Sequence, residues 1–230
     1  MNGDEMMKVK FAPSIMCSDL SQLGLTVKEL EKANVDMIHI DIMDGQYVPN
    51  IVLGTDIVNA LRDITSLPLD LHFMCKEPER IISMFDPKPG ERVTFHPETT
   101  YHPHRLLQQL KQRQCIPGLV LSPGQPLEII EELLPDIEVL QLMAVHPGFP
   151  GAKFQWSCLE KAKKFKKMAE SQGLNISLSI DGSVGPDNAR MIVEAGFDVL
   201  ILGYAGCFAA EYGIGEMISR MRAICSSAGN

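Results

Sequence analysis

The chain has 230 residues, of which 45% are hydrophobic and 22% are charged, and its formal net charge is -8 at pH 7. This composition is typical of a globular protein with a large core, and it excludes an intrinsically disordered chain. The negative charge argues against nucleic acid or a membrane surface as the main partner, although it is compatible with a small phosphate site.

The first residues, MNGDEMMKVKF, contain acidic side chains and no long apolar run. They predict neither a secretory signal nor a membrane span, so we expect a cytoplasmic protein in which residues 1–7 are peripheral or disordered. The six cysteines are scattered without a CxxC pair. Their spacing predicts reduced, mostly buried thiols rather than disulfides or a thiolate zinc site.

Short β-rich runs alternate along the chain with longer segments of helical periodicity. The predicted strands are Val9–Pro13, Met37–Ile42, Leu69–Met74, Arg92–Phe95, Gly118–Leu121, Val139–Val145, Ile176–Ile180 and Val199–Leu202. The predicted helices include Leu20–Ala33, Thr55–Asp63, His104–Arg113, Leu127–Leu133, Leu159–Gln172 and Pro186–Ala195. Eight strands separated by helices predict a single α/β domain over residues 1–230, a closed (β/α)8 TIM barrel of parallel strands. An open doubly wound sheet is the alternative.

Polar side chains recur at the ends of the predicted strands, where a barrel of this kind carries its reactive groups. The segment IHIDIMDG alternates strictly, so that His39, Asp41 and Met43 point one way and the isoleucines point the other. Similar side chains end four other predicted strands, at Ser14, His72, Met74, Met143 and Asp181.

Two histidines and two aspartates at the ends of three strands can converge in one barrel mouth. Each has a structural explanation when taken alone, as a hydrogen-bonded residue or a turn residue. Together they form a credible nitrogen and oxygen ligand set for one divalent metal ion, with Zn, Fe(II), Mn, Co or Mg as candidates. The four residues are His39, Asp41, His72 and Asp181.

Three glycine-rich loops follow the last three predicted strands: HPGFPGAK from His146, DGSVGP from Asp181 and GYAGCF from Gly203. Glycine lets backbone N–H groups approach an anion closely, and this is a frequent phosphate position in barrels. Neither GxxxxGK[ST] nor GxGxxG occurs, so the sequence indicates neither a nucleotide motor nor a nicotinamide enzyme.

The segments APSIMCSDL, IHIDIMDGQYVPNIVLG, LDLHFM, TFHPET, LMAVHPGFPGAKF, SIDGS and LILGYAGCF follow one another in the order seen in ribulose-phosphate 3-epimerases. The chain resembles that family from about Phe11 to about Phe208. The resemblance implies that His39, Asp41, His72 and Asp181 are metal ligands, and that Asp41 and Asp181 are also the catalytic acid and base. It implies substrate contacts at Ser14, Met43, Met74, Met143 and His96. It implies phosphate contacts at Gly148, Gly151, Gly182, Ser183, Gly203, Tyr204 and Ala205.

Some positions differ from the commonest pattern of that family: His146, Pro150, Ala152 and Tyr204. Pro150 removes a backbone donor from its loop, and Tyr204 stands where Ser, Thr or Asn is usual. The sequence DGS at 181–183, Gly206, and HPET at 96–99 are similar to the branch that epimerises D-allulose 6-phosphate.

The expected activity is metal-dependent epimerisation at C3 of a phosphorylated ketose. The substrate expected first is D-ribulose 5-phosphate, and D-allulose 6-phosphate is the alternative. Two bases would move the proton through an enediolate, and we expect neighbours to hold Asp41 or Asp181 protonated in part of the cycle. A phosphosugar lyase or decarboxylase and a non-catalytic sugar-phosphate sensor stay open, although no lysine ends a predicted strand as a lyase would favour. We also expect a homo-oligomer.

Overall fold

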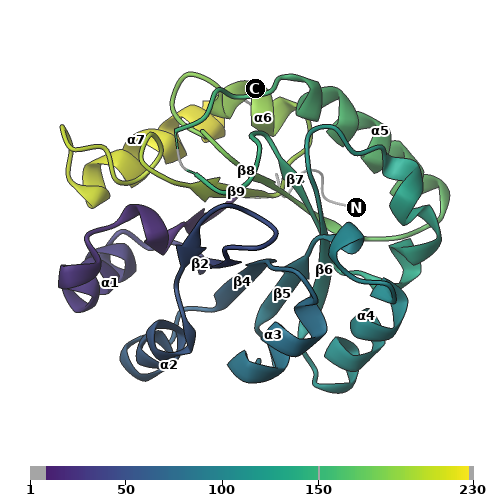
Figure 1. The fold of residues 1–230 in the computed structure, drawn as a ribbon. Helices are drawn as coiled ribbons and strands as arrows, with labels where there is room; N and C mark the ends of the chain where they lie inside the picture. The colour runs from purple at the N-terminus through teal and green to yellow at the C-terminus, as the bar shows by residue number, and fades with distance from the viewer. Residues whose placement is uncertain (1–8, 150, 228–230) are drawn as a thin grey trace, which may run out of the picture.

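The computed structural model describes residues 9–149 and 151–227, and it forms a barrel of parallel strands with helices around it (Figure 1). The parallel strands are β1 (Lys10–Pro13), β2 (Ile38–Asp44), β4 (Leu69–Met74), β5 (Arg92–Phe95), β6 (Ile116–Leu121), β7 (Val139–Met143), β8 (Ser177–Asp181) and β9 (Val199–Leu202). A short strand, β3 (Ile51–Val52), pairs antiparallel with the end of β2. The predicted barrel is confirmed, and the open doubly wound alternative is wrong.

The barrel closes between β1 and β2. The strands follow one another in the order β1-β9-β8-β7-β6-β5-β4-β2, and a parallel bridge between Ser14 and His39 joins the two ends. The register of β2 against β4 places Asp41 beside His72. The register of β7 against β8 places Met143 beside Asp181. Strand pairing therefore brings the predicted site residues to one end of the barrel.

Strand β2 illustrates how the sequence assigns its two faces. Ile38, Ile40 and Ile42 are buried in the core between the strands and the surrounding helices. His39 and Asp41 alternate with them and are also buried, but they point into the barrel. Because side chains alternate along a strand, an apolar outer face and a polar inner face can share one short segment.

The helices around the barrel are amphipathic and bury one face against the strands. In the described residues they are α1 (Leu23–Lys32), α2 (Thr55–Ile64), α3 (Pro78–Phe85), α4 (Pro103–Gln112), α5 (Ser157–Ser171), α6 (Ala189–Glu194) and α7 (Ile214–Ser226). Sequence analysis does not identify α3 and α7. In the case of α3, the proline at its first position is the start signal that was overlooked.

Three predicted helices differ from the structure. The helix predicted from Leu20 begins with a 3-10 helix, Leu20–Gln22, and α1 starts at Leu23. The segment predicted as a helix over 127–133 is a 3-10 helix, Leu127–Asp136, and it contains Pro135, which lacks the N–H that an α-helix would use there. The helix predicted to start at Pro186 starts at Ala189 instead. The Asn188 side chain accepts a hydrogen bond from the Gly185 N–H and donates one to the Ser183 carbonyl, each at 2.9 Å, so these residues form a turn.

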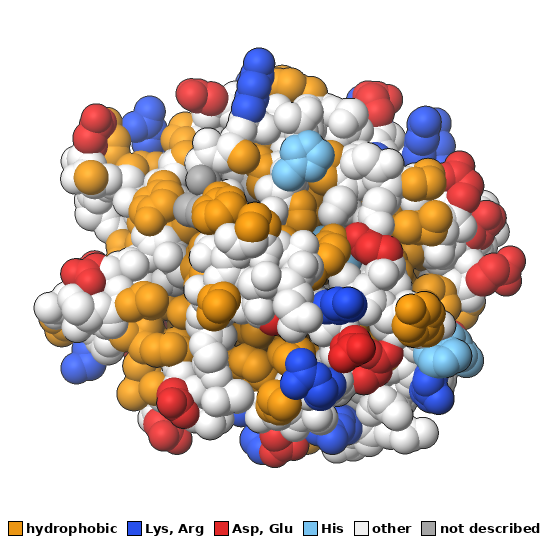
Figure 2. Space-filling view, in the orientation of Figure 1, with side chains coloured by type: hydrophobic (Ala, Val, Ile, Leu, Met, Phe, Trp, Pro, Cys, Tyr) orange, Lys and Arg blue, Asp and Glu red, His pale blue; other side chains and the backbone are white. Residues whose placement is uncertain are grey.

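All six cysteines are free and buried, as predicted. None of the helices over 9–149 and 151–227 is long and apolar enough to cross a bilayer. On the face seen in Figure 2, side chains of both charges are interspersed, and no large basic patch lies on it. The N-terminal expectation for residues 1–7 lies outside the described residues, and the homo-oligomer stays a prediction.

Gly118 on β6 provides a test of barrel packing. A Cβ added there would lie 2.7 Å from the Val139 carbonyl oxygen and 2.9 Å from Cγ2 of Thr94. We expect Gly118→Ala to lower the free energy of unfolding by about 1–3 kcal/mol in urea denaturation, because both neighbours must move. Gly124→Ala has open space around its Cβ and should change it by less than about 0.5 kcal/mol. Equal effects of the two changes would contradict the packing argument.

Candidate active site

A pocket of about 140 Å³ opens at the carboxyl ends of the strands, and it has room for a small ligand. Every residue predicted to contact substrate or phosphate lines it, with the exception of His96. The pocket also contains residues that the prediction did not include: Met16, Cys17, Val145, Pro147, Phe149 and Val184. Met16 and Cys17 lie in the segment that follows β1, where sequence analysis selected Ser14 alone.

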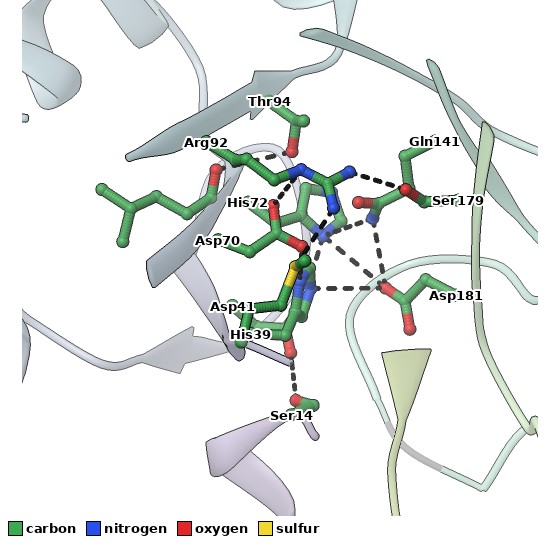
Figure 3. A network of polar contacts seen from close by, with 12 residues as sticks. Ser14, His39, Asp41, Asp70, His72, Arg92, Thr94, Gln141, Ser179 and Asp181 are labelled. Carbon is green, nitrogen blue, oxygen red and sulfur yellow. Dashed lines mark hydrogen bonds and ion pairs between the residues drawn. The ribbon is translucent and has the colours of Figure 1, made fainter. Parts of the chain in front are cut away.

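The four predicted metal ligands lie together at the base of this pocket (Figure 3). Each offers one ligand atom, and the four atoms lie within 4.8 Å of one another. Oδ1 of Asp41 is 3.3 Å from Nε2 of His39 and 3.2 Å from Nδ1 of His72. Oδ2 of Asp181 is 3.9 Å from Nε2 of His39 and 3.6 Å from Nδ1 of His72. His39, Asp41, His72 and Asp181 could therefore hold one cation.

Nε2 of His39 provides the strongest indication of a cation. It is buried, and it has no hydrogen-bond partner within the described part of the chain. It faces the carboxylates of Asp41 and Asp181. A buried, unpartnered nitrogen beside two carboxylates is the arrangement that a divalent metal satisfies, and the donor set suits several such metals.

Asp70 holds the His39 ring from behind. Its Oδ2 lies 2.8 Å from Nδ1 of His39, and its Oδ1 faces Nε of Arg92 at 3.6 Å. Burial would raise the pKa of the Asp70 carboxyl, but Arg92 and His39 outweigh burial and lower it. An ionised Asp70 accepts a hydrogen bond from the Nδ1–H of His39, so Nε2 of His39 is directed toward the site.

Sequence analysis missed Asp70, Arg92 and Gln141, all of which are buried inside the barrel. Asp70 and His72 are two residues apart in LDLHFM and share a face, which is the signal that could have found Asp70. Arg92 donates to Ser179 Oγ at 2.7 Å, and an arginine in a buried strand always requires such partners. Gln141 donates from Nε2 to Oδ2 of Asp181 at 3.4 Å.

The substrate contact of His96 stays a prediction, because the structure places this side chain behind His72 and not in the pocket lining. Its side chain is fully buried and does not line the pocket. Nε2 of His96 lies 3.1 Å from Nε2 of His72, and its Nδ1 lies 3.1 Å from the Tyr47 hydroxyl. Burial, with His72 as a second cause, lowers the pKa of His96 well below its usual value. His96 is therefore a neutral hydrogen-bond partner of His72. It follows the end of β5, and it lies beneath the ring of His72 on the neighbouring strand.

Asp41 and Asp181 have different surroundings. Ser14 donates to Oδ2 of Asp41 at 2.5 Å. Burial would raise the pKa of the Asp41 carboxyl, but His39 and His72 outweigh burial and lower it well below its ordinary range. The Asp181 side chain is 15% exposed, whereas that of Asp41 is 5% exposed. Asp41 is thus the buried, ionised carboxylate, and Asp181 is the carboxylate more open to the pocket.

The loops after β8 and β9 present backbone groups to the pocket. Gly182 has φ +111, and a Cβ there would lie 2.5 Å from Cγ2 of Val145, so only glycine fits. The N–H groups of Ser183, Val184 and Ala205 have no hydrogen-bond acceptor in the part of the chain that the structure describes. No lysine or arginine lines the pocket there. An anion would therefore be held by backbone N–H groups. The predicted loss of a donor at Pro150 concerns a residue outside the described part of the chain.

Comparison with known proteins gives a consistent picture. The model of the "Ribulose-phosphate 3 epimerase family" matches residues 10–206. The chain is 41% identical to "Ribulose-phosphate 3-epimerase" of Bacillus subtilis, over 86% of this chain and 91% of that protein. It is 40% identical to "Ribulose-5-phosphate-3-epimerase, chloroplastic" of Arabidopsis thaliana, over 87% of this chain and 72% of that protein. Among solved structures, thiamine phosphate pyrophosphorylase from Pyrococcus furiosus covers 97% of this chain and 98% of its own at a TM-score of 0.64. At 18% identity it supports the fold alone.

The pairing of His39 and His72 with aspartates predicts how the stability of the metal-free protein depends on pH. Burial would lower the pKa of His39, but Asp41 and Asp70 outweigh it and raise this pKa well above 6.5; the pKa of His72 is also raised. Because the folded pKa values exceed the unfolded value, this stabilisation is complete below about pH 6.5 and is lost as the pH rises through the folded values. In EDTA, we expect the urea midpoint to fall as the pH rises above about 6.5.

A saturating divalent cation is the control for this measurement. Metal binding requires both imidazoles to be neutral, so stabilisation by the cation should increase over the same pH range. A midpoint in EDTA that stays constant or rises would contradict the paired, protonated histidines.

Proposed function

The chain belongs to the ribulose-phosphate 3-epimerase family, an isomerase-class family, and on this premise we propose that it epimerises D-ribulose 5-phosphate to D-xylulose 5-phosphate. The observation that carries the proposal is that Asp41 on β2 and Asp181 on β8 both line one pocket and both face the same two imidazoles. Epimerisation needs two groups that exchange a proton with one carbon, and two such carboxylates meet that need.

A divalent metal held by His39, Asp41, His72 and Asp181 would supply positive charge that stabilises the enediolate formed when C3 of the ketose loses its proton. The protein itself orients this set. Asp70 fixes the His39 ring, and Gln141 contacts both His72 and Asp181. The ligand atoms thereby stay in position before substrate arrives.

Asp41 and Asp181 share the proton transfer. Asp41 is held ionised by its histidine partners, so it acts as the base that removes the C3 proton. Asp181, on β8 and more open to the pocket, must enter this step protonated, and it returns its proton to the carbon. The roles exchange when the reaction runs in reverse. Met43, Met74 and Met143 line the pocket with non-acidic walls that exclude water from the carbanionic centre.

The phosphate group of the substrate would bind at the loops after β8 and β9. The N–H groups of Ser183, Val184 and Ala205, which have no acceptor among the described residues, supply donors, and their backbone position matches the phosphate site frequent in barrels. Tyr204 lies at the same rim with half of its surface exposed. These loops carry two of the features that resemble the D-allulose 6-phosphate branch, DGS at 181–183 and Gly206, so this hexose phosphate is the second candidate substrate.

Family membership and the pocket both favour an epimerase over the two other classes. The described pocket contains no lysine, which a lyase with a Schiff base would need. A sensor that binds sugar phosphate has no need of two carboxylates beside two buried imidazoles, each of which costs free energy to bury.

The test is proton NMR in D2O with metal-reconstituted protein and, separately, D-ribulose 5-phosphate and D-allulose 6-phosphate. We expect deuterium at C3 together with the epimeric product, and the faster substrate identifies the chain length. Asp41→Asn and Asp181→Asn should each lower kcat by at least about 10³-fold without loss of the fold, because each removes a proton-transfer group.

Asp187→Asn is the matched control for these variants. Asp187 is exposed, lies six residues after Asp181 and is not among the described residues that line the pocket. Its change from carboxylate to amide should leave turnover within about twofold of the wild type. Near-normal turnover in Asp41→Asn or Asp181→Asn would refute the two-base mechanism, and absence of C3 exchange with both sugars would refute the epimerase.

The phosphate loops predict a strong dependence on the substrate's phosphate. Three hydrogen bonds to a charged group, each contributing about 1.5–3 kcal/mol, correspond to roughly 10³-fold or more in affinity. We therefore expect kcat/KM for D-ribulose to be lower than for D-ribulose 5-phosphate by at least this factor. Inorganic phosphate should inhibit competitively. Comparable kcat/KM values for the two sugars would contradict a phosphate site at these loops.

A further inference from the structure

His39 and His72, the two histidines of the proposed metal site, have different partners behind them. The His39 ring leans on a carboxylate, that of Asp70. The His72 ring leans on a second imidazole, that of His96, with 3.1 Å between the two Nε2 atoms. Two imidazole nitrogens can form a hydrogen bond only if one carries a proton and the other does not. The His72–His96 pair therefore depends on which tautomer each ring adopts.

The direction of this hydrogen bond follows from the other side of His72. Nδ1 of His72 faces Asp41 and Asp181, and it would bind the cation through its lone pair. A neutral imidazole that binds metal through Nδ1 keeps its proton on Nε2. His72 therefore donates from Nε2, and Nε2 of His96 accepts. The single proton of His96 is then on Nδ1.

Tyr47 and Glu98 complete the line of hydrogen bonds. Nδ1 of His96 lies 3.1 Å from the Tyr47 hydroxyl, and that hydroxyl donates to Oε1 of Glu98 at 2.6 Å. A hydroxyl can accept one hydrogen bond while it donates another, so all the bonds run in one direction. Oε1 of Glu98 is 3.7 Å from Nδ1 of His96, too far to replace the hydroxyl.

The Tyr47 hydroxyl is held in place by its own loop. Asp44 accepts hydrogen bonds from the N–H groups of Gln46 and Tyr47, at 2.9 Å and 3.1 Å, and one from Lys76 at 2.9 Å. The Tyr47 ring packs on Met43 and Met74, which line the pocket. The phenol is therefore oriented by the backbone and by packing, rather than by its hydrogen bonds alone.

We propose that Tyr47, acting through His96 and supported by Glu98, is a positioning residue that selects the metal-binding tautomer of His72. If the hydroxyl is removed, Nδ1 of His96 loses its acceptor, and the His96 proton is free to move to Nε2. That tautomer sets an N–H against the N–H of His72 and opposes the ring orientation that binds the cation. The inference rests on the proposed metal site, and it assigns to a loop residue an effect on a ligand that it does not touch.

The test uses Tyr47→Phe, which keeps the packed ring and removes the hydroxyl alone. Tyr101→Phe is the matched control, since Tyr101 is 97% exposed. Loss of a partner behind a metal ligand typically costs 10- to 100-fold in metal affinity, so we expect Tyr47→Phe to weaken Co²⁺ binding by about tenfold. The affinity is measured by chelator competition from the visible absorption of bound Co²⁺. Glu98→Ala, on an exposed turn, should weaken it by about threefold.

A second readout separates tautomer selection from general loosening of the structure. In Zn²⁺-loaded protein with ¹⁵N-labelled histidine, the ring nitrogens report which one carries the proton, and the chain has 6 histidines to assign. We expect His96 to carry its single proton at Nδ1 in the wild type and in Tyr101→Phe, and to divide between the Nδ1–H and Nε2–H tautomers in Tyr47→Phe.

The outcomes distinguish this inference from the function it rests on. Wild-type protein that binds neither Co²⁺ nor Zn²⁺ overturns the metal site and the positioning role together. Wild-type protein that binds metal, with unchanged affinity and unchanged His96 protonation in Tyr47→Phe, overturns the positioning role alone and leaves the metal site intact. Weakened binding with a shifted His96 proton supports it.

Discussion

The buried carboxylate of Asp41 is the group on which the rest of this site depends. Burying a charge costs several kcal/mol unless partners surround it, and Asp41 has Ser14 from the end of β1, His39 from its own strand and His72 from β4. The same residues mark where the barrel closes, since the bridge between Ser14 and His39 joins β1 to β2. The strand pairing that closes the barrel therefore also supplies the hydrogen-bond partners of this buried carboxylate.

A second polar layer below the site makes that arrangement rigid. Asp70, Arg92 and Ser179 lie inside the barrel where other barrels place apolar layers, and Arg92 links β5 to β8. Replacing such a network with apolar residues is often neutral or stabilising for a fold. Its use here is better explained by the site, because Asp70 fixes the ring of His39 and so fixes one ligand direction. The buried charges of Asp70 and Arg92 are thus explained by the orientation of His39 and not by the stability of the fold.

Sequence reasoning recovers the site residues that follow from the alternation of side chains along a strand. It misses those whose role depends on how deep inside the barrel they lie. The alternation in IHIDIMDG predicts that His39 and Asp41 face inward, and the barrel rule places them beside His72 and Asp181. Nothing in a one-dimensional pattern separates a strand-end residue at the pocket from one a layer deeper, which is why the sequence predicts a substrate contact for His96 and does not identify Asp70. The helix predicted over 127–133 failed because a local proline outweighed a helical periodicity.

The groups proposed for the chemistry lie on strands, whereas the positions at which this chain differs from the commonest family pattern lie in loops. The groups proposed to transfer the proton and to bind the metal lie on β2, β4 and β8, whose register is fixed by several hydrogen-bonded pairs. The positions at which the chain departs from the commonest family pattern, such as Tyr204 and Ser183, lie in loops at the rim. Changes of substrate length can therefore accumulate in the loops without moving the reacting groups. The Tyr47 loop is the exception: it lies at the rim yet reaches His72 through His96, so a change in this loop would alter the chemistry as well as the fit.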